Sequence, residues 1–176
     1  MRLFVAVNFD EKIKEALALD IEKLKNFSVD GNFTHKENLH LTIAFIGETN
    51  KKQDAAAALA NIDEESFALS INGFGCFRRN GGDIYWRGIQ PSPQLNKIYE
   101  QVYSGLTEKG FVLEKRPFKP HLTLGRRVVT SEKFNFSAFK KSLPKITAPV
   151  KRVSLMKSER IDGKLCYTEI FGVDLH

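Results

Sequence analysis

The sequence has few cysteines and no long apolar run, and both shortages narrow the classes of protein it can encode. Its 176 residues include only two cysteines, Cys76 and Cys166, which lie far apart and form no C-x-x-C pair. This pattern predicts free, buried thiols in a reducing cytoplasm, with one disulfide as the alternative. No apolar stretch approaches a membrane span, and the apolar run at the start is too short for a signal peptide. We therefore expect a cytoplasmic protein without a membrane segment.

Acidic residues are scarcer than basic ones. Twenty-one Asp and Glu residues against 27 Lys and Arg residues give a formal net charge of +6. This balance favours a polyanionic partner such as a nucleic acid. The alternative for any one basic cluster, such as Arg78-Arg79 or Arg126-Arg127, is a solvated surface without a partner. Low-complexity segments are also absent, and the length and composition predict one globular domain over residues 1–176.

Histidine is scarce as well, yet two of the four histidines stand in nearly identical surroundings. His40-Leu41-Thr42-Ile43 and His121-Leu122-Thr123-Leu124 both read as His-apolar-Thr-apolar. With this composition, about 0.03 such matches are expected by chance in the chain, and two would occur on the order of once in a couple of thousand chains. The repeat therefore predicts a shared function for the two motifs.

Hydrophobic periodicity predicts an order of strands and helices in which pairs of strands joined by turns are common. The expected strands cover residues 2–9, 39–46, 66–76, 83–90, 111–115, 121–129, 149–157 and 164–173. The expected helices cover residues 10–27, 50–60, a segment that ends near 109 and a short segment at 137–142. A hairpin is indicated by Arg79-Asn80-Gly81-Gly82.

This order predicts an α+β fold of mostly antiparallel sheets with helices outside. Each half of the chain begins with a strand, a helix and a strand that carries His-x-Thr, and the two motifs lie close to half the chain length apart. We therefore expect two pseudo-symmetric lobes, of the kind that a duplication produces, with one motif on each side of a central cleft.

Strand alternation predicts what each motif presents to that cleft. His40 and Thr42 share one face, whereas Leu39, Leu41, Ile43 and Phe45 share the other and are expected to pack on helices. By the same rule His121 and Thr123 share a face. The small residues Ala44 and Gly125, which follow each threonine on that face, are expected to leave room for a ligand.

Two imidazoles on one cleft suit acid–base catalysis at a phosphate. A neutral His accepts a proton from the attacking oxygen, and a protonated His donates one to the leaving oxygen. Thr42 and Thr123 would donate hydrogen bonds to the non-bridging phosphate oxygens, and we expect no metal or other cofactor. Two alternatives remain for the histidines. Each is a strand residue bonded to a neighbour, or both are metal ligands, although the motifs supply no third ligand.

The remaining two histidines have no comparable surroundings. His35 lies in a turn and His176 at the terminus. We expect both to be exposed and without a catalytic role.

The motifs and their flanks resemble those of the 2H phosphoesterase superfamily. Within it, Glu37-Asn38-Leu39-His40-Leu41-Thr42-Ile43 running into Phe45-Ile46-Gly47-Glu48, together with His121-Leu122-Thr123-Leu124-Gly125-Arg126, is most similar to bacterial and archaeal RNA 2′,3′-cyclic phosphodiesterases, long labelled 2′-5′ RNA ligases. The opening strand, Arg2-Leu3-Phe4-Val5-Ala6-Val7, fits too. The resemblance covers nearly the whole chain.

The resemblance implies a bilobal fold and an enzyme that opens an RNA 2′,3′-cyclic phosphate to a 2′-phosphomonoester. It implies that His40 is the proton donor to the 3′ oxygen and that His121 is the proton acceptor that activates water. The implied partner is an RNA with a cyclic phosphate end, and we expect a monomer without an obligate protein partner. The alternatives are a 2′-5′ RNA ligase, a phosphodiesterase for a small cyclic nucleotide, and an RNA-binding module without catalysis.

The resemblance also implies a phosphate-binding role for Arg126. Strict alternation places Arg126 on the packed face with Leu122, and a bulge at Gly125 would turn it toward the cleft. We favour the bulge, because an unpaired arginine on a packed face is costly. The chain has Phe33 near the position where relatives often have Trp, so the base-stacking residue is open. Phe9, Tyr85 and Trp86 are candidates, with a place in the core as the alternative.

Overall fold

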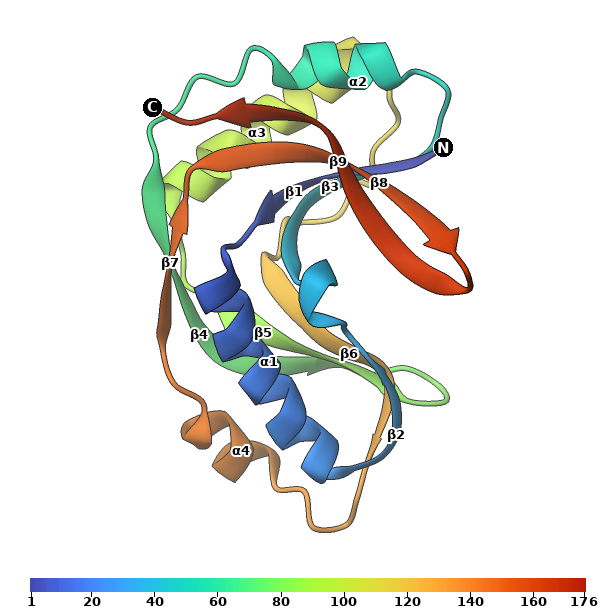
Figure 1. Cartoon of the computed structure of the whole chain (residues 1–176). Helices are drawn as coiled ribbons and strands as arrows, with labels where there is room; N and C mark the ends of the chain where they lie inside the picture. The colour runs from blue at the N-terminus through green and yellow to red at the C-terminus, as the bar shows by residue number, and fades with distance from the viewer.

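The computed structural model of the chain describes all 176 residues, and it contains two antiparallel sheets with helices on their outer faces (Figure 1). The first sheet has the order β3-β1-β8-β9, with strands β1 (Arg2–Asn8), β3 (His40–Glu48), β8 (Arg152–Ile161) and β9 (Lys164–Asp174). The second has the order β2-β6-β5-β4-β7, with strands β2 (Ser28–Phe33), β4 (Phe67–Phe77), β5 (Asp83–Ile89), β6 (His121–Thr130) and β7 (Ile146–Val150). The predicted α+β class is confirmed.

The helices follow the amphipathic segments of the sequence. They are α1 (Glu11–Asn26), α2 (Lys52–Leu59), α3 (Pro93–Glu108) and α4 (Phe136–Ser142), with a short 3-10 helix, η1 (Lys36–Asn38). The Asp10 carboxylate caps α1 by accepting a hydrogen bond from the Ile13 N–H (3.0 Å), and the Ser92 hydroxyl caps α3 in the same way. None of the helices has both the length and the apolar character that a membrane crossing requires.

Three segments differ from the sequence-based expectation. Residues 111–115 are not a strand, although the alternation is real: Phe111 and Leu113 are buried and Val112 is exposed, but no neighbouring strand pairs with them. The expected strand 149–157 is interrupted at Lys151, which separates β7 from β8. Strand β2 was not predicted, because its polar sequence with a central glycine lacks the apolar alternation of a half-buried strand.

The two long helices are exchanged between the halves of the chain. Helix α1 follows β1 of the first sheet, but it leads into β2 of the second sheet and packs against β2, β6 and β7 of that sheet before the chain returns through η1 to β3. Helix α3 connects β5 to β6 of the second sheet, yet it packs against β3 of the first. Figure 1 shows α1 beside the lower sheet and α3 beside the upper one. One continuous core of 36 buried residues therefore draws on both sheets.

A buried ion pair fastens α1 to the second sheet. Asp20 on the buried face of α1 and Arg87 on β5 are 1% and 0% exposed, and their side chains form a salt bridge. The Arg87 guanidinium also donates to the carbonyl oxygens of Gly73 (2.9 Å) and Pro144 (2.7 Å). The Arg87 charge is therefore paired and hydrogen-bonded, which makes its burial tolerable. Asp20 Oδ1, by contrast, is buried without a hydrogen-bond partner, and burial raises the pKa of the Asp20 carboxyl although Arg87 opposes the rise.

Candidate active site

The two His-x-Thr motifs begin two strands that contact one another, although they belong to different sheets. His40 is the first residue of β3 and His121 is the first residue of β6, and these two strands are in contact. On each strand the apolar neighbours of the histidine, Leu41 and Leu122, are fully buried. The histidines and threonines of both motifs are only partly buried and share the opposite face of their sheet. We call this face, defined by His40, Thr42, His121 and Thr123, the histidine face.

Both imidazoles are oriented by the same kind of hydrogen bond. The Nδ1 atom of His40 lies 2.6 Å from the carbonyl oxygen of Asn38, and the Nδ1 atom of His121 lies 2.6 Å from the carbonyl oxygen of Lys119. A carbonyl only accepts, so each Nδ1 carries a proton, and the Nε2 atom of the neutral ring is left as an acceptor. Nε2 is therefore the atom that each histidine presents for chemistry. In His40 it lies 2.9 Å from the hydroxyl oxygen of Thr42.

Each motif contains a β-bulge at its fourth residue. Ala6 pairs with Thr42 and Val5 with Ala44, so Ile43 has no partner. Trp86 pairs with Thr123 and Tyr85 with Gly125, so Leu124 has none. An extra residue shifts the alternation of all that follow. The side chain two positions after each unpaired residue, Phe45 in β3 and Arg126 in β6, therefore lies on the histidine face.

The bulges overturn part of the predicted alternation. Phe45, expected on the packed face, is 52% exposed and lies 6.3 Å from the Phe4 ring. Ala44 and Gly125, expected on the ligand side, are buried instead. A Cβ at residue 125 would lie only 2.8 Å from Val128 Cγ2, so this glycine serves close packing in the core rather than space for a ligand.

The same bulge brings Arg126 to the histidine face. Arg126 is exposed, and its positive charge contributes to the lowered pKa of both His40 and His121. A second irregularity follows, because Arg127 has a left-handed backbone with φ of 54°. All five residues selected from the sequence thus lie on two strands that contact one another, β3 and β6: His40, Thr42, His121, Thr123 and Arg126.

Comparison with known proteins identifies the family of the chain. The family model of the 2′-5′ RNA ligase superfamily matches residues 13–162. The chain belongs to this superfamily.

Its relatives and structural neighbours cover most of the chain. An RNA 2′,3′-cyclic phosphodiesterase of Thermotoga maritima is 29% identical over 90% of this chain and 87% of its own length. An RNA 2′,3′-cyclic phosphodiesterase of Archaeoglobus fulgidus is 34% identical over 72% of each chain. The structure of E. coli LigT complexed with 3′-AMP superposes with a TM-score of 0.82 and 26% identity, over 99% of this chain and 97% of that one.

The electrostatics of this superfamily member favour neutral imidazoles at pH 7. Burial is the main reason that the pKa of His40 and that of His121 lie below the ordinary value of 6.5. The hydrogen bonds to the Asn38 and Lys119 carbonyls oppose this effect, and the charge of Arg126 adds to it. An anion bound between the rings would reverse the balance, because a negative charge favours the imidazolium.

Aromatic rings surround both histidines, and sequence patterns alone missed most of them. The His40 ring lies 5.0 Å from Phe4 and 5.1 Å from Tyr167, which it meets edge to face. The His121 ring lies 5.2 Å from Phe77 and 5.9 Å from Trp86. Phe4 comes from β1, which pairs with β3, and Tyr167 comes from β9 at the other edge of the same sheet. These neighbours could be found only from the pairing of the strands, which a single sequence does not reveal.

Two of the three aromatic candidates named from the sequence are core residues. Tyr85 is buried and stacks on Phe74 at 5.5 Å, and Phe9 is buried in the main core. The alternative of a place in the core is therefore confirmed for both, and neither ring is free to stack on a base. Trp86, by contrast, lies close to His121. Its indole packs directly over Gly75, where an added Cβ would come within 2.2 Å of the ring, so only glycine fits there.

The remaining candidate ligands are scattered. No three His, Cys, Asp or Glu side chains are grouped so as to hold a metal ion. Cys76 and Cys166 are free and only partly buried, not fully buried as expected. His35 is exposed, and exposed His176 pairs with Asp63 at 2.8 Å.

Proposed function

We propose that the protein is an RNA 2′,3′-cyclic phosphodiesterase that hydrolyses a terminal 2′,3′-cyclic phosphate to a 2′-phosphomonoester. The observation that carries this proposal is the pair of Nδ1–carbonyl hydrogen bonds, which leave one Nε2 atom on each of two adjacent strands for proton transfer. The curated relatives named RNA 2′,3′-cyclic phosphodiesterases support the substrate class.

The two histidines take opposite roles in the proposed reaction. Nε2 of neutral His121 accepts a proton from water, whose oxygen attacks the phosphorus. The bond from phosphorus to the 3′ oxygen breaks, and Nε2–H of protonated His40 donates a proton to that oxygen. The products are a 2′-phosphomonoester and a free 3′ hydroxyl.

The hydroxyls and the guanidinium hold the phosphate. While His40 is neutral, the Thr42 hydroxyl donates to its Nε2 2.9 Å away. Once His40 is protonated and its Nε2–H points to the leaving oxygen, the Thr42 hydroxyl hydrogen is available to a phosphate oxygen. Thr123 and Arg126 would donate to the same non-bridging oxygens, where negative charge grows in the transition state. The anionic substrate also favours the protonated form of His40, which compensates for the lowered pKa of its imidazole.

The proposal extends to the setting of the enzyme. Residues 1–176 would act as one bilobal domain, with the RNA end bound in a central cleft between the lobes. The enzyme would work as a monomer in the cytoplasm without metal or other cofactor, because two imidazoles supply both proton transfers. The single domain is supported by the continuous core, and the cytoplasmic setting by the two cysteines, which form no disulfide.

The experiment that tests the function is incubation with an oligoribonucleotide that ends in a 2′,3′-cyclic phosphate, in excess EDTA, followed by identification of the product. We expect complete conversion to the 2′-phosphate with undiminished rate in EDTA. A 3′-phosphate product would contradict the assigned roles. Binding without turnover would favour the RNA-binding module, and joining of a 5′-hydroxyl strand as the main outcome would favour the ligase.

A further inference from the structure

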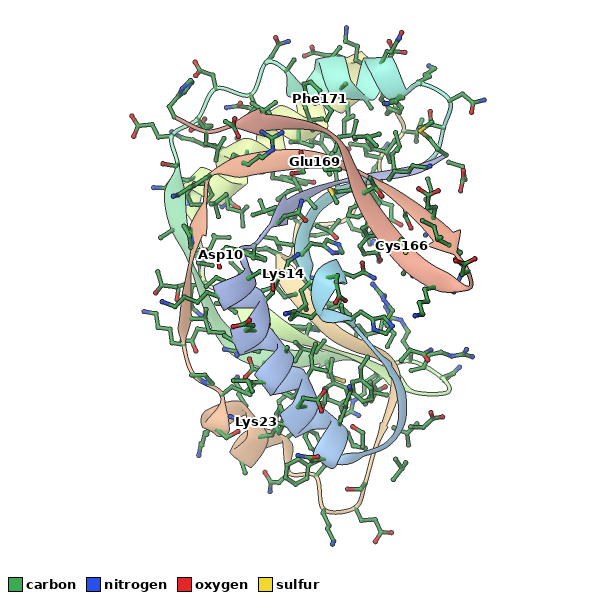
Figure 2. The ribbon with its side chains drawn as sticks, viewed as in Figure 1. Asp10, Lys14, Lys23, Cys166, Glu169 and Phe171 are labelled. Atoms are coloured by element: carbon green, nitrogen blue, oxygen red, sulfur yellow. The ribbon has the colours of Figure 1, made fainter.

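The hairpin formed by β8 and β9 projects beyond the first sheet. Strand β1 pairs with β8 only as far as Ser158, and β9 is an edge strand, so residues 159–166 pair only with one another. Figure 1 shows this hairpin extending past the end of β1, and Figure 2 shows Cys166 on the projecting part. The Asn38 side-chain amide donates to the carbonyl oxygen of Leu165 (2.8 Å). The hairpin is thereby held beside the segment that leads into His40.

One face of this hairpin continues the histidine face. Residues directly opposite one another on paired strands point to the same side, and Arg2, Ser158 and Tyr167 form one such row across β1, β8 and β9. Tyr167 lies 5.1 Å from His40. The next residue of β8 on this side, toward the tip of the hairpin, is Arg160, about 7 Å further along the strand. We call Arg2, Ser158, Arg160 and Tyr167 the hairpin strip.

The cations of the hairpin strip have no carboxylate partner. Arg160 is exposed and donates only to the carbonyl oxygen of Gly163 in its own turn (2.9 Å). Arg2 is exposed and forms no ion pair, although Glu48 is its register partner on β3. Glu48 pairs instead with the N-terminal ammonium group at 3.4 Å.

The nearby carboxylates do not neutralise the strip. Glu159 points to the opposite face of the hairpin and pairs with Lys157 at 2.8 Å, and Asp162 lies in the turn. Arg2 and Arg126 both oppose, through their positive charges, the rise in the pKa of the Tyr167 hydroxyl that its burial causes. Arg2 is in the same cross-strand row as Tyr167, and the bulge turns Arg126 to the face that carries the histidines. Arg126, Arg2 and Arg160 therefore give this continuous face three cations.

We infer that the hairpin strip binds the sugar–phosphate backbone of the nucleotides that precede the cyclic end of a single-stranded RNA. This inference rests on the proposed function, because it takes the cyclic phosphate to lie at the two histidines. Arginines without partners on an exposed strand match consecutive backbone phosphates, and an aromatic ring beside them suits the apolar faces of nucleotides. The enzyme would then prefer an oligoribonucleotide end to a free cyclic nucleotide.

The test compares two substrates in the full-length protein. One is adenosine 2′,3′-cyclic phosphate, and the other is an oligoribonucleotide with the same terminal nucleotide. We expect Arg160→Gln to lower kcat/KM for the oligoribonucleotide about 3- to 10-fold, as the loss of one phosphate contact does. The rate with the mononucleotide should stay within 2-fold, and the salt dependence with the oligoribonucleotide should lose about 0.7 in log–log slope.

The matched control is Lys164→Gln, which removes the same charge from the same hairpin. Leu165 is the register partner of Arg160 and shares its face of the hairpin. Lys164 is the residue before Leu165 on the same strand, so its side chain points to the opposite face. The control should change neither substrate by more than 2-fold. An equal loss for both substrates in Arg160→Gln, no loss for either, or an equal effect of Lys164→Gln would overturn the inference.

A binding measurement separates this inference from the proposed function. Fluorescence anisotropy of a labelled oligoribonucleotide that ends in a 2′-phosphate measures binding to the hairpin strip without any turnover. If the wild-type protein hydrolyses neither substrate but Arg160→Gln still weakens this binding 3- to 10-fold, the strip stands and the proposed function fails. If the wild type hydrolyses the substrates and Arg160→Gln binds the oligoribonucleotide as tightly as the wild type does, the proposed function is supported and RNA binding by the hairpin strip is ruled out.

Discussion

At the scale of single residues, the chemistry of the site is determined by which ring nitrogen each histidine presents. A backbone carbonyl two residues before each histidine holds Nδ1, and the same contact recurs in both halves of the chain at the same length of 2.6 Å. Because folding already holds each ring in this orientation, no reorganisation energy is needed when the reaction takes place. Nε2 is thus the proton-transfer atom on both strands.

Substitution of either histidine tests this arrangement. We expect His40→Ala and His121→Ala each to lower kcat about 100- to 10,000-fold, the range of a lost general acid or base. Both positions begin a strand on the histidine face and are not in the main core, so the melting temperature should change little. Steady-state kinetics and thermal unfolding measure the two effects. A single mutant that keeps near wild-type kcat would rule out the two-histidine mechanism.

The pH dependence follows from the lowered pKa of both imidazoles. The rate requires one protonated and one neutral histidine, so kcat/KM should be bell-shaped, with its maximum midway between the two free-enzyme pKa values. Since burial lowers both below 6.5, that maximum should lie on the acidic side of pH 6.5. The bound phosphodiester anion raises the pKa of His40, so the maximum of kcat should lie at higher pH. A kcat/KM maximum at pH 8 would contradict this account.

The sequence determines the paired His and Thr residues but not everything beside them. His40 and Thr42 follow from simple alternation, because they precede the bulge. Phe45 follows the bulge, and a bulge depends on how the strand pairs with β1, which a single strand does not reveal. For Arg126 the expectation of a bulge came from the cost of burying an unpaired arginine rather than from the pattern itself.

At the scale of secondary-structure elements, the ion pair between α1 and β5 is the most consequential single contact. We expect Asp20→Ala to destabilise the protein by about 3–5 kcal/mol, because it leaves the Arg87 charge buried without its partner. Urea unfolding followed by circular dichroism measures the change. Glu22→Ala is the control on the same helix. Its exposed pair with Lys25 should contribute less than about 1 kcal/mol.

Elements were predictable where burial on one side produced a regular pattern. Helix α3 has buried residues at Leu95, Ile98, Val102 and Leu106, and its expected end near residue 109 agrees with the structure. Strand β2 has no such pattern, because it is a polar edge strand. The segment 111–115 has the pattern without the partner. Alternation therefore indicates an extended chain, and only the neighbouring strand makes it part of a sheet.

At the scale of the whole molecule, the exchanged helices join the two lobes. Helix α1 supplies core residues to the sheet that carries His121, and α3 supplies them to the sheet that carries His40. The periodicity of each helix predicts which face is buried, but not which sheet it covers. The two-lobed arrangement was therefore predictable, whereas the exchange was not.

The exchange leads us to expect that the chain unfolds in one step. Calorimetry should give a single transition whose van't Hoff and calorimetric enthalpies agree. Asp20→Ala should shift that whole transition rather than split it, because neither lobe keeps its core without the helix from the other. Two resolved transitions would show that the lobes are independent.

The exchanged helices also bear on whether either half of the chain can fold alone. A single half, with its helix directed away from its own sheet, would leave that sheet uncovered and its helix without a core. Each sheet also takes strands from both halves of the sequence. Separately expressed halves should therefore regain the fold, and with it both His-x-Thr strands, only when they are mixed.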